Sequence, residues 1–467
     1  MEKNGLRKKA IKAIEDVEWI PTNSKNRILS MINERPDWCV SRQRNWGVPI
    51  TIFIEKKTQK PLMDPEVNKK ILSVLKYKGV DSWFALSNDE FLTKNHNPDD
   101  YVKVDSILDV WFDSGASHAF VLKNKNIDIA DLYLEGSDQH RGWFQTSLLE
   151  SCGLYGRSPY KSVLTHGFVI DDKGKKMSKS LGNVISPKQV TAKYGADILR
   201  IWVASSNFTE DVRISFENLD RHSESYRKIR NTIRFILGNL NGWKLNKKVS
   251  YEKLPELEKY ILHRLWITND EVKKMFNEFN FSKAFQIILN FCNAELSAFF
   301  FDIRKDSLYC DDLSSKKRKL SIDLLNIILE CLIKWFAPVL SFTTEEISQL
   351  ASKNKKTSIH EENFPKIPDN WKNDNLFNKW EKILKIRQQV NIAIEEKRSS
   401  KIIGSSLEAE VKIDLPKSDF DLLNTIDTKE LFIISKISQN VSAKENLIVN
   451  VKKADGQKCS RCWKIFE

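Results

Sequence analysis

The chain has 467 residues, which is enough for about three domains of ordinary size. Lysine and arginine number 75 against 62 acidic residues, and the net charge of +13 fits a polyanionic partner, although charge alone identifies none. Seven cysteines, an odd number without a framework pattern, argue against a disulfide-rich secreted scaffold and for a reducing compartment. The N-terminus lacks the apolar core of a signal peptide, and the most apolar stretch, 331–342, is broken by Lys334 and Pro338, so we expect no membrane-spanning segment.

The first part of the chain predicts an α/β domain. Residues 1–40 are interpreted as a helix and a connector, with Pro21 and Pro36 as breaks. From Ser41 to about Phe216, short apolar runs alternate with helical stretches, including predicted strands at 163–164 and 168–170 and a helix at 198–204. This alternation favours a parallel sheet, in which ligands collect at the C-terminal ends of the strands.

After about residue 220 the pattern changes to long helices. In 226–240 one face is apolar, whereas Arg227, Arg230 and Arg234 share another face. Further helices are predicted at 281–301, 322–336 and 381–396, which together indicate a helical bundle. A solvated helix face explains most arginine rows of this kind, and contact with RNA is the alternative.

The C-terminal part and two lysine-rich patches have shorter patterns. From Gly404 onward the sequence is mixed and predicts a small α/β junction. The patches at 316–319 and 353–356 are predicted to be loops.

The string Lys176-Met177-Ser178-Lys179-Ser180 lies between a predicted turn at 171–174 and the break Gly182-Asn183. Two ammonium groups three residues apart on a mobile loop suit a polyphosphate, because they can spread the charge that develops when a bond to the α-phosphorus breaks. A lysine-rich surface turn would be the better interpretation of an isolated Lys-x-x-Lys. The string Glu-Gly-Ser-Asp-Gln-His-Arg-Gly-Trp at 135–143 precedes this one and weakens that alternative.

Together with four further strings, these two resemble the isoleucyl-tRNA synthetases, which are class I aminoacyl-tRNA synthetases. The further strings are RPDWCVSRQR at 35–44, DVWFDSG at 109–115, THGF at 165–168 and YGADILR at 194–200. The terminal Cys-x-x-Cys-Trp resembles the bacterial form. The resemblance implies a Rossmann-like α/β catalytic portion, an α-helical anticodon-binding bundle and a small C-terminal α/β junction. It also implies activation of isoleucine by Mg-ATP to isoleucyl-AMP, followed by transfer to tRNA(Ile).

The resemblance also assigns roles to individual residues. Lys179, with Lys176 beside it, is expected to contact ATP and assist catalysis, since lysine is a flexible point charge. The isoleucyl-adenylate is expected to be bound by Glu135, Gly136, Asp138 and Gln139, with Trp111 and Trp143 as walls of the isoleucine pocket and His166 near the nucleotide. Without their neighbours, core packing would be the commoner role of the tryptophans, and a structural role is an open alternative for His166.

Two features of the family are not found in this chain. None of the seven histidines forms the His-x-Gly-His type signature that contacts ATP in class I synthetases, and nothing resembles the editing insertion. We therefore expect the chain to be the C-terminal portion of a longer enzyme and to be inactive alone. The expected organisation is a connector at 1–40, the second half of the catalytic domain at 41–218, the anticodon-binding domain at 219–400, the junction at 401–455 and the start of a zinc-binding module at 456–467.

The last expectations concern the metal, the partners and the rival functions. Cys459 and Cys462 have zinc-knuckle spacing, but a single Cys-x-x-Cys is half of a tetrahedral site, and two free thiols are the alternative. We expect a cytoplasmic monomer that binds tRNA(Ile), isoleucine and ATP and no membrane. A valyl or leucyl relative is the nearest rival. A non-catalytic tRNA-binding fragment, which would not need intact loops at 135–139 and 176–180, is the rival from another class.

Overall fold

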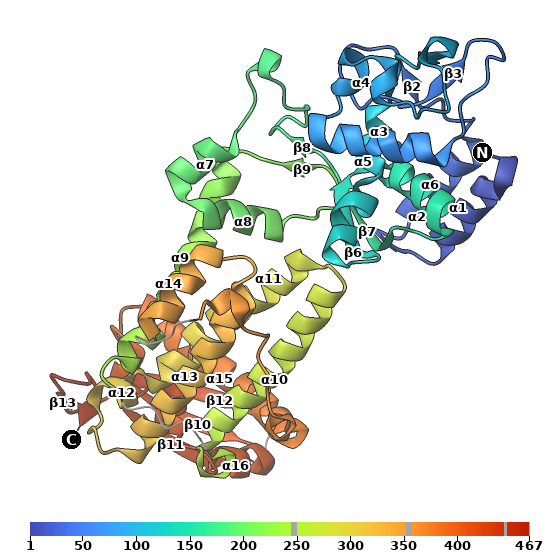
Figure 1. The fold of residues 1–467 in the computed structure, drawn as a ribbon. Coiled ribbons are helices and arrows are strands. Elements are labelled where there is room, and N and C mark those ends of the chain that lie inside the picture. Colours follow the sequence, from blue (N-terminus) through green and yellow to red (C-terminus); the bar gives the residue numbers. More distant parts are fainter. Residues whose placement is uncertain (244–249, 352–356, 443–445, 467) are drawn as a thin grey trace. The chain divides into compact units, whose positions relative to one another are not determined.

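The computed structural model describes residues 1–243, 250–351, 357–442 and 446–466, and it divides into two compact units (Figure 1). Unit 1 comprises residues 1–170 and 208–212, and unit 2 comprises 171–207 and 213–467. The predicted domain at 41–218 is split between the two units, because residues 171–207 and 213–218 belong to unit 2. The predicted loop at 353–356 lies outside the described residues.

Unit 1 is built on a three-stranded parallel sheet in the order β1-β7-β6. Its strands are β1 (Glu18–Ile20), β6 (Ala130–Gly136) and β7 (Tyr160–His166). Helix α6 (Trp143–Tyr155) connects β6 to β7, as the crossover of parallel strands requires, and its residues from Phe144 to Cys152 are all buried. The predicted α/β portion with a parallel sheet is confirmed.

Residues 1–40 belong to this sheet and its core. Helix α1 (Leu6–Glu15), β1 and helix α2 (Ser24–Glu34) fill most of the segment, and Trp19 of β1 lies opposite Val163 of β7. Ile14, Ile28 and Trp19 are buried in one cluster with α6. The interpretation of this segment as a connector missed a strand of three residues, which is too short to show a period of two.

The remaining elements of unit 1 lie mostly between α2 and β6. A second hydrophobic cluster, centred on Phe53, Trp83 and Phe91, holds the segment around α3 together. The elements are β2 (Ser41–Arg42), β3 (Phe53–Glu55), α3 (Pro65–Lys78), α4 (Ser82–Ala85), β4 (Tyr101–Lys103), β5 (Ile107–Leu108), α5 (Val110–Gly115) and β8 (Val169–Ile170), with β9 (Val212–Arg213) beginning in unit 1.

Unit 2 is dominated by a helical bundle, which confirms the predicted helices. Its helices are α7 (Pro187–Tyr194), α8 (Ala196–Ser205), α9 (Phe216–Leu240), α10 (Glu256–Asn277), α11 (Phe281–Asn290), a π-helical segment (Phe291–Phe301), α12 (Asp302–Cys310), α13 (Lys316–Phe336), α14 (Ser341–Ala351) and α15 (Asp374–Ser399). Helix α8 docks on the bundle through Asp197, whose carboxylate accepts from the Thr343 hydroxyl at 2.6 Å, and through Arg200, which donates to the Val339 carbonyl at 2.9 Å.

One sequence expectation about the bundle was wrong. The patch at 316–319 is the first turn of α13, because Ser315 caps the helix by accepting from the Arg318 amide. The helical stretch Phe281–Cys310 is long and apolar enough to cross a membrane by length and composition. Half of its most apolar window is buried in the protein, including Phe291, Leu296 and Phe300, as in the core helix of a bundle.

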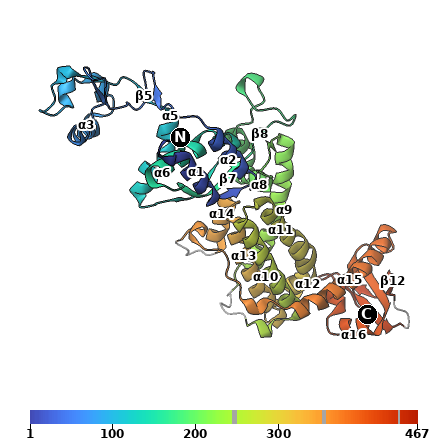
Figure 2. The ribbon, with the colours of Figure 1, turned by 90° about the vertical axis from the view of Figure 1, so that its right-hand side faces the viewer.

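A small α/β module completes unit 2. Strand β10 (Ala409–Leu415) pairs in parallel with β11 (Lys436–Val441) and antiparallel with β12 (Ile448–Lys453). The helices α16 (Lys417–Leu423) and α17 (Thr428–Phe432) precede β11, and the hairpin of β13 (Gln457–Lys458) and β14 (Ile465–Phe466) follows. Helix α15 runs from the bundle to this module and packs on β12 (Figure 2). The predicted small α/β junction is confirmed.

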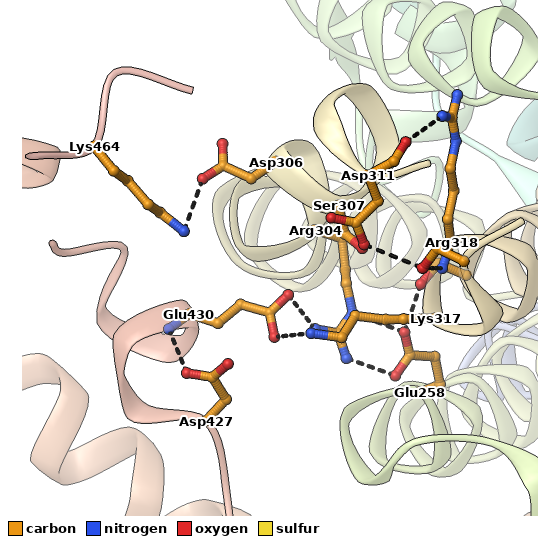
Figure 3. Close-up of polar contacts among 12 residues, drawn as sticks. Glu258, Arg304, Asp306, Ser307, Asp311, Lys317, Arg318, Asp427, Glu430 and Lys464 are labelled. Atoms are coloured by element: carbon orange, nitrogen blue, oxygen red, sulfur yellow. Dashed lines mark hydrogen bonds and ion pairs between the residues drawn. The ribbon is translucent and has the colours of Figure 1, made fainter. Parts of the chain in front are cut away.

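A buried ion network joins the bundle to the module (Figure 3). Arg304 of α12 donates Nε to one oxygen of Glu258 at 2.7 Å and Nη2 to the other at 2.8 Å, a bidentate pair. Its Nη1 lies 2.7 Å from Glu430 of α17, which also accepts from Lys317 at 3.0 Å. The Arg304 and Glu258 side chains are 5% and 0% exposed. Arg304 bridges two acids from different helices, and with Lys317 the network contains two positive and two negative charges.

The Arg304→Ala substitution should destabilise unit 2 by about 3–5 kcal/mol, because it leaves the Glu258 carboxylate buried without its counter-charge. Urea unfolding of the chain, followed by circular dichroism, measures this change. The matched control is Arg221→Ala, which breaks the exposed pair with Glu217 on α9 and should cost about 0.3–0.5 kcal/mol. Equal losses in the two variants would contradict the importance of the buried network.

Candidate functional site

The C-terminal edge of the parallel sheet brings together residues from two strands. Gly136, the last residue of β6, lies opposite His166, the last residue of β7, and Glu135 lies opposite Thr165. Glu135 is exposed, and His166 is half-buried with Nδ1 at 2.7 Å from the Gly167 carbonyl oxygen. A carboxylate and an imidazole therefore stand at the edge where ligands of parallel sheets bind.

The loop after β6 turns sharply into α6. A Cβ on Gly136 would lie 2.8 Å from an Asp138 carboxylate oxygen, so the missing side chain lets the loop fold back on itself. The Gln139 side-chain oxygen accepts from the main-chain amide of Trp143, the first residue of α6, at 3.0 Å. Asp138 is exposed, and its carboxylate accepts from the Gln139 amide at 3.5 Å. The structure thus gives the Gln139 oxygen a structural role that the sequence did not predict.

The Trp111 ring lies against Gly142, the residue that precedes Trp143 at the start of α6. A Cβ on Gly142 would lie 2.8 Å from two ring atoms of Trp111, so the indole rests on this glycine. Trp143 stacks on Tyr133 with ring centres 4.0 Å apart, and its Nε1 donates to the Ser114 carbonyl at 3.0 Å. Trp111 is 42% exposed, which leaves part of its face open to a ligand.

Asp109 is a central residue that the sequence reasoning did not select. Its buried carboxylate lies 2.5 Å from Arg42, accepts from the Trp38 indole at 3.0 Å and accepts from the Trp111 amide at 3.2 Å as the N-cap of α5. Arg35 stands over the Trp38 ring, and burial lowers the pKa of its guanidinium. The strings at 35–44 and 109–115 thus form one cluster. An aspartate directly before a short helix was the signal that could have indicated this cap.

The loop with Lys176 and Lys179 belongs to unit 2 and is held by two side chains. The Asp171 carboxylate accepts from the main-chain amide of Lys175 at 2.7 Å and from the side-chain NH2 group of Asn183 at 2.8 Å. The hydrogen bond from Asn183 lowers the pKa of the Asp171 carboxyl. The Asn183 side-chain oxygen accepts from the Ser178 amide at 2.9 Å. Lys176 and Lys179 are both exposed. Hydrogen bonds therefore hold the base of the loop together, and the loop exposes two lysine side chains to solvent.

The predicted arginine face lies on α9 as expected. Arg227, Arg230 and Arg234 are exposed, whereas Ile229, Ile233 and Ile236 on the other side are buried. Arg227 pairs with Glu224 on the same helix, and Arg230 donates to the Tyr226 hydroxyl at 3.1 Å.

Cys459 and Cys462 lie in the turn of the β13–β14 hairpin. The Arg461 amide donates to the Cys459 sulfur at 3.4 Å, a contact suited to a thiolate, and both cysteines are free and partly exposed. Zinc in structural sites takes four ligands, and these two thiols fit half of such a set. Within the described residues no group of three or more histidine, cysteine or acidic side chains is arranged to hold a metal.

The sequence of this chain matches two known protein families. Residues 1–215 match the class I tRNA synthetases (I, L, M and V), and residues 258–413 match the anticodon-binding domain of tRNA ligases. The chain therefore contains a class I tRNA synthetase domain followed by an anticodon-binding domain.

The relatives it resembles are named isoleucine–tRNA ligases. The chain is 53% identical to that of Pelagibacter ubique, over 100% of this chain and 52% of the relative. It is 46% identical to that of Zymomonas mobilis, over 98% of this chain and 49% of the relative. The chain thus spans about half the length of these relatives.

Two solved structures share its fold. A leucyl-tRNA synthetase of Agrobacterium radiobacter in a ternary complex with tRNA and LeuAMS has a TM-score of 0.56 at 16% identity, covering 88% of this chain and 51% of that chain. The methionyl-tRNA synthetase of Mycobacterium tuberculosis with methionyl-adenylate has a TM-score of 0.52 at 17% identity, covering 75% of this chain and 65% of that chain. The Rossmann-like portion followed by a helical bundle is therefore the fold of this class.

The Gly142→Ala substitution should destabilise unit 1 by about 1–3 kcal/mol, because the new methyl would overlap the Gln139 oxygen at 2.5 Å and the Trp111 ring at 2.8 Å. Urea unfolding followed by tryptophan fluorescence measures the change. Gly153→Ala, in the same helix α6, is the control: its nearest outside atom is 4.0 Å away, and it should stabilise by up to about 1 kcal/mol. Opposite signs are expected, and equal effects would contradict the close contact.

Proposed function

We propose that this chain carries part of an isoleucine–tRNA ligase. The proposed reaction has two steps: the isoleucine carboxylate attacks the α-phosphorus of Mg-ATP and expels pyrophosphate, and the terminal ribose hydroxyl of tRNA(Ile) then takes the acyl group. The observation that carries the proposal is the high identity along the whole chain to relatives with that name. Because the chain spans half of their length, the complete activity belongs to the whole protein.

The proposed chemistry needs no nucleophile from the protein. It depends on positioning the substrates and on stabilising negative charge, which a pair of ammonium groups near the phosphates can do. Lys179 and Lys176 are the proposed cations, and their exposure on a loop with a braced base supports this role. Mg-ATP is a substrate here, and class I synthetases use both ATP and Mg²⁺.

The isoleucyl-adenylate is proposed to bind at the C-terminal edge of the sheet. Glu135 offers a carboxylate to the substrate ammonium, and Gly136 offers close backbone approach. The Trp111 and Trp143 rings offer rigid apolar area to the aliphatic side chain, and the position of the Trp111 ring against Gly142, next to Trp143 in the chain, supports this role. Asp138 and His166 are proposed to face the nucleotide, whereas Gln139 is proposed to use its side-chain NH2 group, because its oxygen accepts from the Trp143 main-chain amide.

The helical bundle of unit 2 is proposed to bind tRNA. The match of residues 258–413 to the anticodon-binding domain supports this proposal, as does the row of exposed arginines on α9. Cys459 and Cys462 are proposed as half of a zinc site in the whole protein, which we propose to be a cytoplasmic monomer. The rival functions are a valyl or leucyl ligase and a non-catalytic tRNA-binding fragment, and the experiments below discriminate among them.

In the full-length enzyme, Lys179→Ala should lower the kcat of isoleucine-dependent pyrophosphate exchange by at least about 100-fold, because the ammonium acts mainly as charge moves onto pyrophosphate. The KM for isoleucine should change little. Lys188→Ala, an exposed lysine on the following helix α7, is the control and should leave both constants unchanged. A raised KM with unchanged kcat would refute the role of Lys179, and exchange driven by valine or leucine instead would refute the substrate.

Arg227→Ala, Arg230→Ala and Arg234→Ala should each weaken tRNA(Ile) binding and reduce the slope of log K against log salt by about one, as expected for the loss of one phosphate contact. Filter binding of the 467-residue chain at several salt concentrations measures both quantities. Arg221→Ala is the control, because Arg221 lies on a different face of the same helix and pairs with Glu217. Unchanged slopes in all three variants would exclude this face from the tRNA interface.

A further inference from the structure

The joint between α5 and α6 buries a carboxyl group against a glycine. Glu150, two turns into α6, is 9% exposed, and its Oε1 has no hydrogen-bond partner among the described residues. A Cβ on Gly115, the last residue of α5, would lie 2.2 Å from that oxygen, so the carboxyl is pressed against the end of α5. Buried polar atoms without partners are rare, and each one calls for a reason.

The surroundings of Glu150 oppose its ionisation. Burial, and then the Asp113 carboxylate on α5, raise the pKa of Glu150 to about 8. Burial also raises the pKa of Asp113, with Asp109 contributing. In the unfolded chain Glu150 would titrate near its ordinary value, so the fold favours the protonated acid and is penalised as the pH rises toward the raised pKa.

The groups that face this joint from other elements do not supply a counter-charge. Tyr133 of β6 is kept neutral because burial raises its pKa, and His118 after α5 is kept neutral because burial lowers its pKa. Arg157 acts on His118, and Lys9 of α1 acts on the neighbouring Cys152 thiol, but neither contributes to the shift at Glu150. An ionised Glu150 would therefore be repelled by the Asp113 carboxylate, with no positive charge among the described residues to offset the repulsion.

Both tryptophans of the candidate pocket depend on this joint. Trp111 belongs to α5, and Trp143 donates its Nε1 to the Ser114 carbonyl at 3.0 Å and to the Ser117 hydroxyl at 3.1 Å. The Ser147 hydroxyl of α6 donates to the Gly115 carbonyl at 2.9 Å, next to the carboxyl of Glu150. Repulsion between two carboxylates at this point would move α5 away from α6 and displace both indoles.

We propose that Glu150 is a positioning residue whose neutral carboxyl keeps α5 seated on α6 and thereby holds Trp111 and Trp143 in place. The effect of Glu150 on the positions of the two indoles does not depend on the proposed function, whereas its effect on isoleucine binding rests on that function. The two parts are tested separately below.

The structural test is fluorine NMR of the 467-residue chain labelled with 5-fluorotryptophan, with the signals of Trp111 and Trp143 assigned through the Trp111→Phe and Trp143→Phe variants. Both signals should shift together with a midpoint near the raised pKa of about 8. The shift should be absent in Glu150→Gln, which cannot ionise, and present in the control Glu34→Gln, which makes the same chemical change at an exposed site on α2. Identical titrations in Glu150→Gln and the unsubstituted chain overturn the proposal.

A second variant keeps the test decisive if Glu150→Gln does not fold. Asp113→Asn removes the neighbouring carboxylate and should move the midpoint of both signals to lower pH, because one cause of the raised pKa is gone. An unmoved midpoint overturns the assignment to Glu150.

The functional test is the pH dependence of isoleucine-dependent pyrophosphate exchange in the full-length enzyme. The ratio of kcat/KM for isoleucine, unsubstituted over Glu150→Gln, should fall about tenfold between about pH 7 and about pH 9, because about one-tenth of a group with a pKa of about 8 stays protonated one unit higher. A constant ratio overturns the effect on the pocket. Absence of any isoleucine-dependent exchange by the unsubstituted enzyme instead overturns the proposed function and leaves the NMR result to decide the positioning role.

Discussion

The parallel pairing of β6 with β7 is the constraint on which the candidate site depends. It places the end of one strand beside the end of the other, so that Glu135 and Gly136 stand next to His166. Parallel strands need a crossover, and α6 supplies it while also carrying Trp143 at its first position. The loop between β6 and α6 is therefore both the connection that the sheet requires and the surface proposed to bind the adenylate.

Close backbone contacts then decide where the aromatic side chains stand. Gly142 leaves room for the Trp111 ring, and Gly115 leaves room for the carboxyl of Glu150. Each of these contacts joins α5 to the loop or helix of the sheet crossover. The positions of the Trp111 and Trp143 rings, the proposed pocket walls, are thus set by packing between two short segments, which makes them sensitive to a single added methyl or a single added charge.

Unit 2 uses charge in two different ways. At its centre Arg304 is buried between Glu258 and Glu430, and with Lys317 it balances the two acids and joins the bundle to the small α/β module. On its surface the arginines of α9 stay exposed and available to a polyanion. Burial distinguishes the two uses, because a desolvated charge must be paired within the protein, whereas a solvated one can exchange partners.

The sequence by itself determined the class of fold, the long helices and the two loops with chemical character. Apolar periodicity specifies helices such as α9 directly. A local string such as the one at 176–180 can be recognised without knowledge of the tertiary structure around it. It did not reveal β1, because three residues carry no period, nor the helical start of α13, because a lysine run has no preference that distinguishes a loop from a first turn.

Only the tertiary structure decided which side chains meet. Asp109 gathers Arg42, Trp38 and the start of α5 from segments far apart in the chain, and no local pattern marks such a convergence. The orphaned oxygen of Glu150 is likewise a property of the α5–α6 contact and not of the helix that carries it. Desolvation and proximity act through space, so the ionisation state of such a group is set by the packed fold and not by its neighbours in sequence.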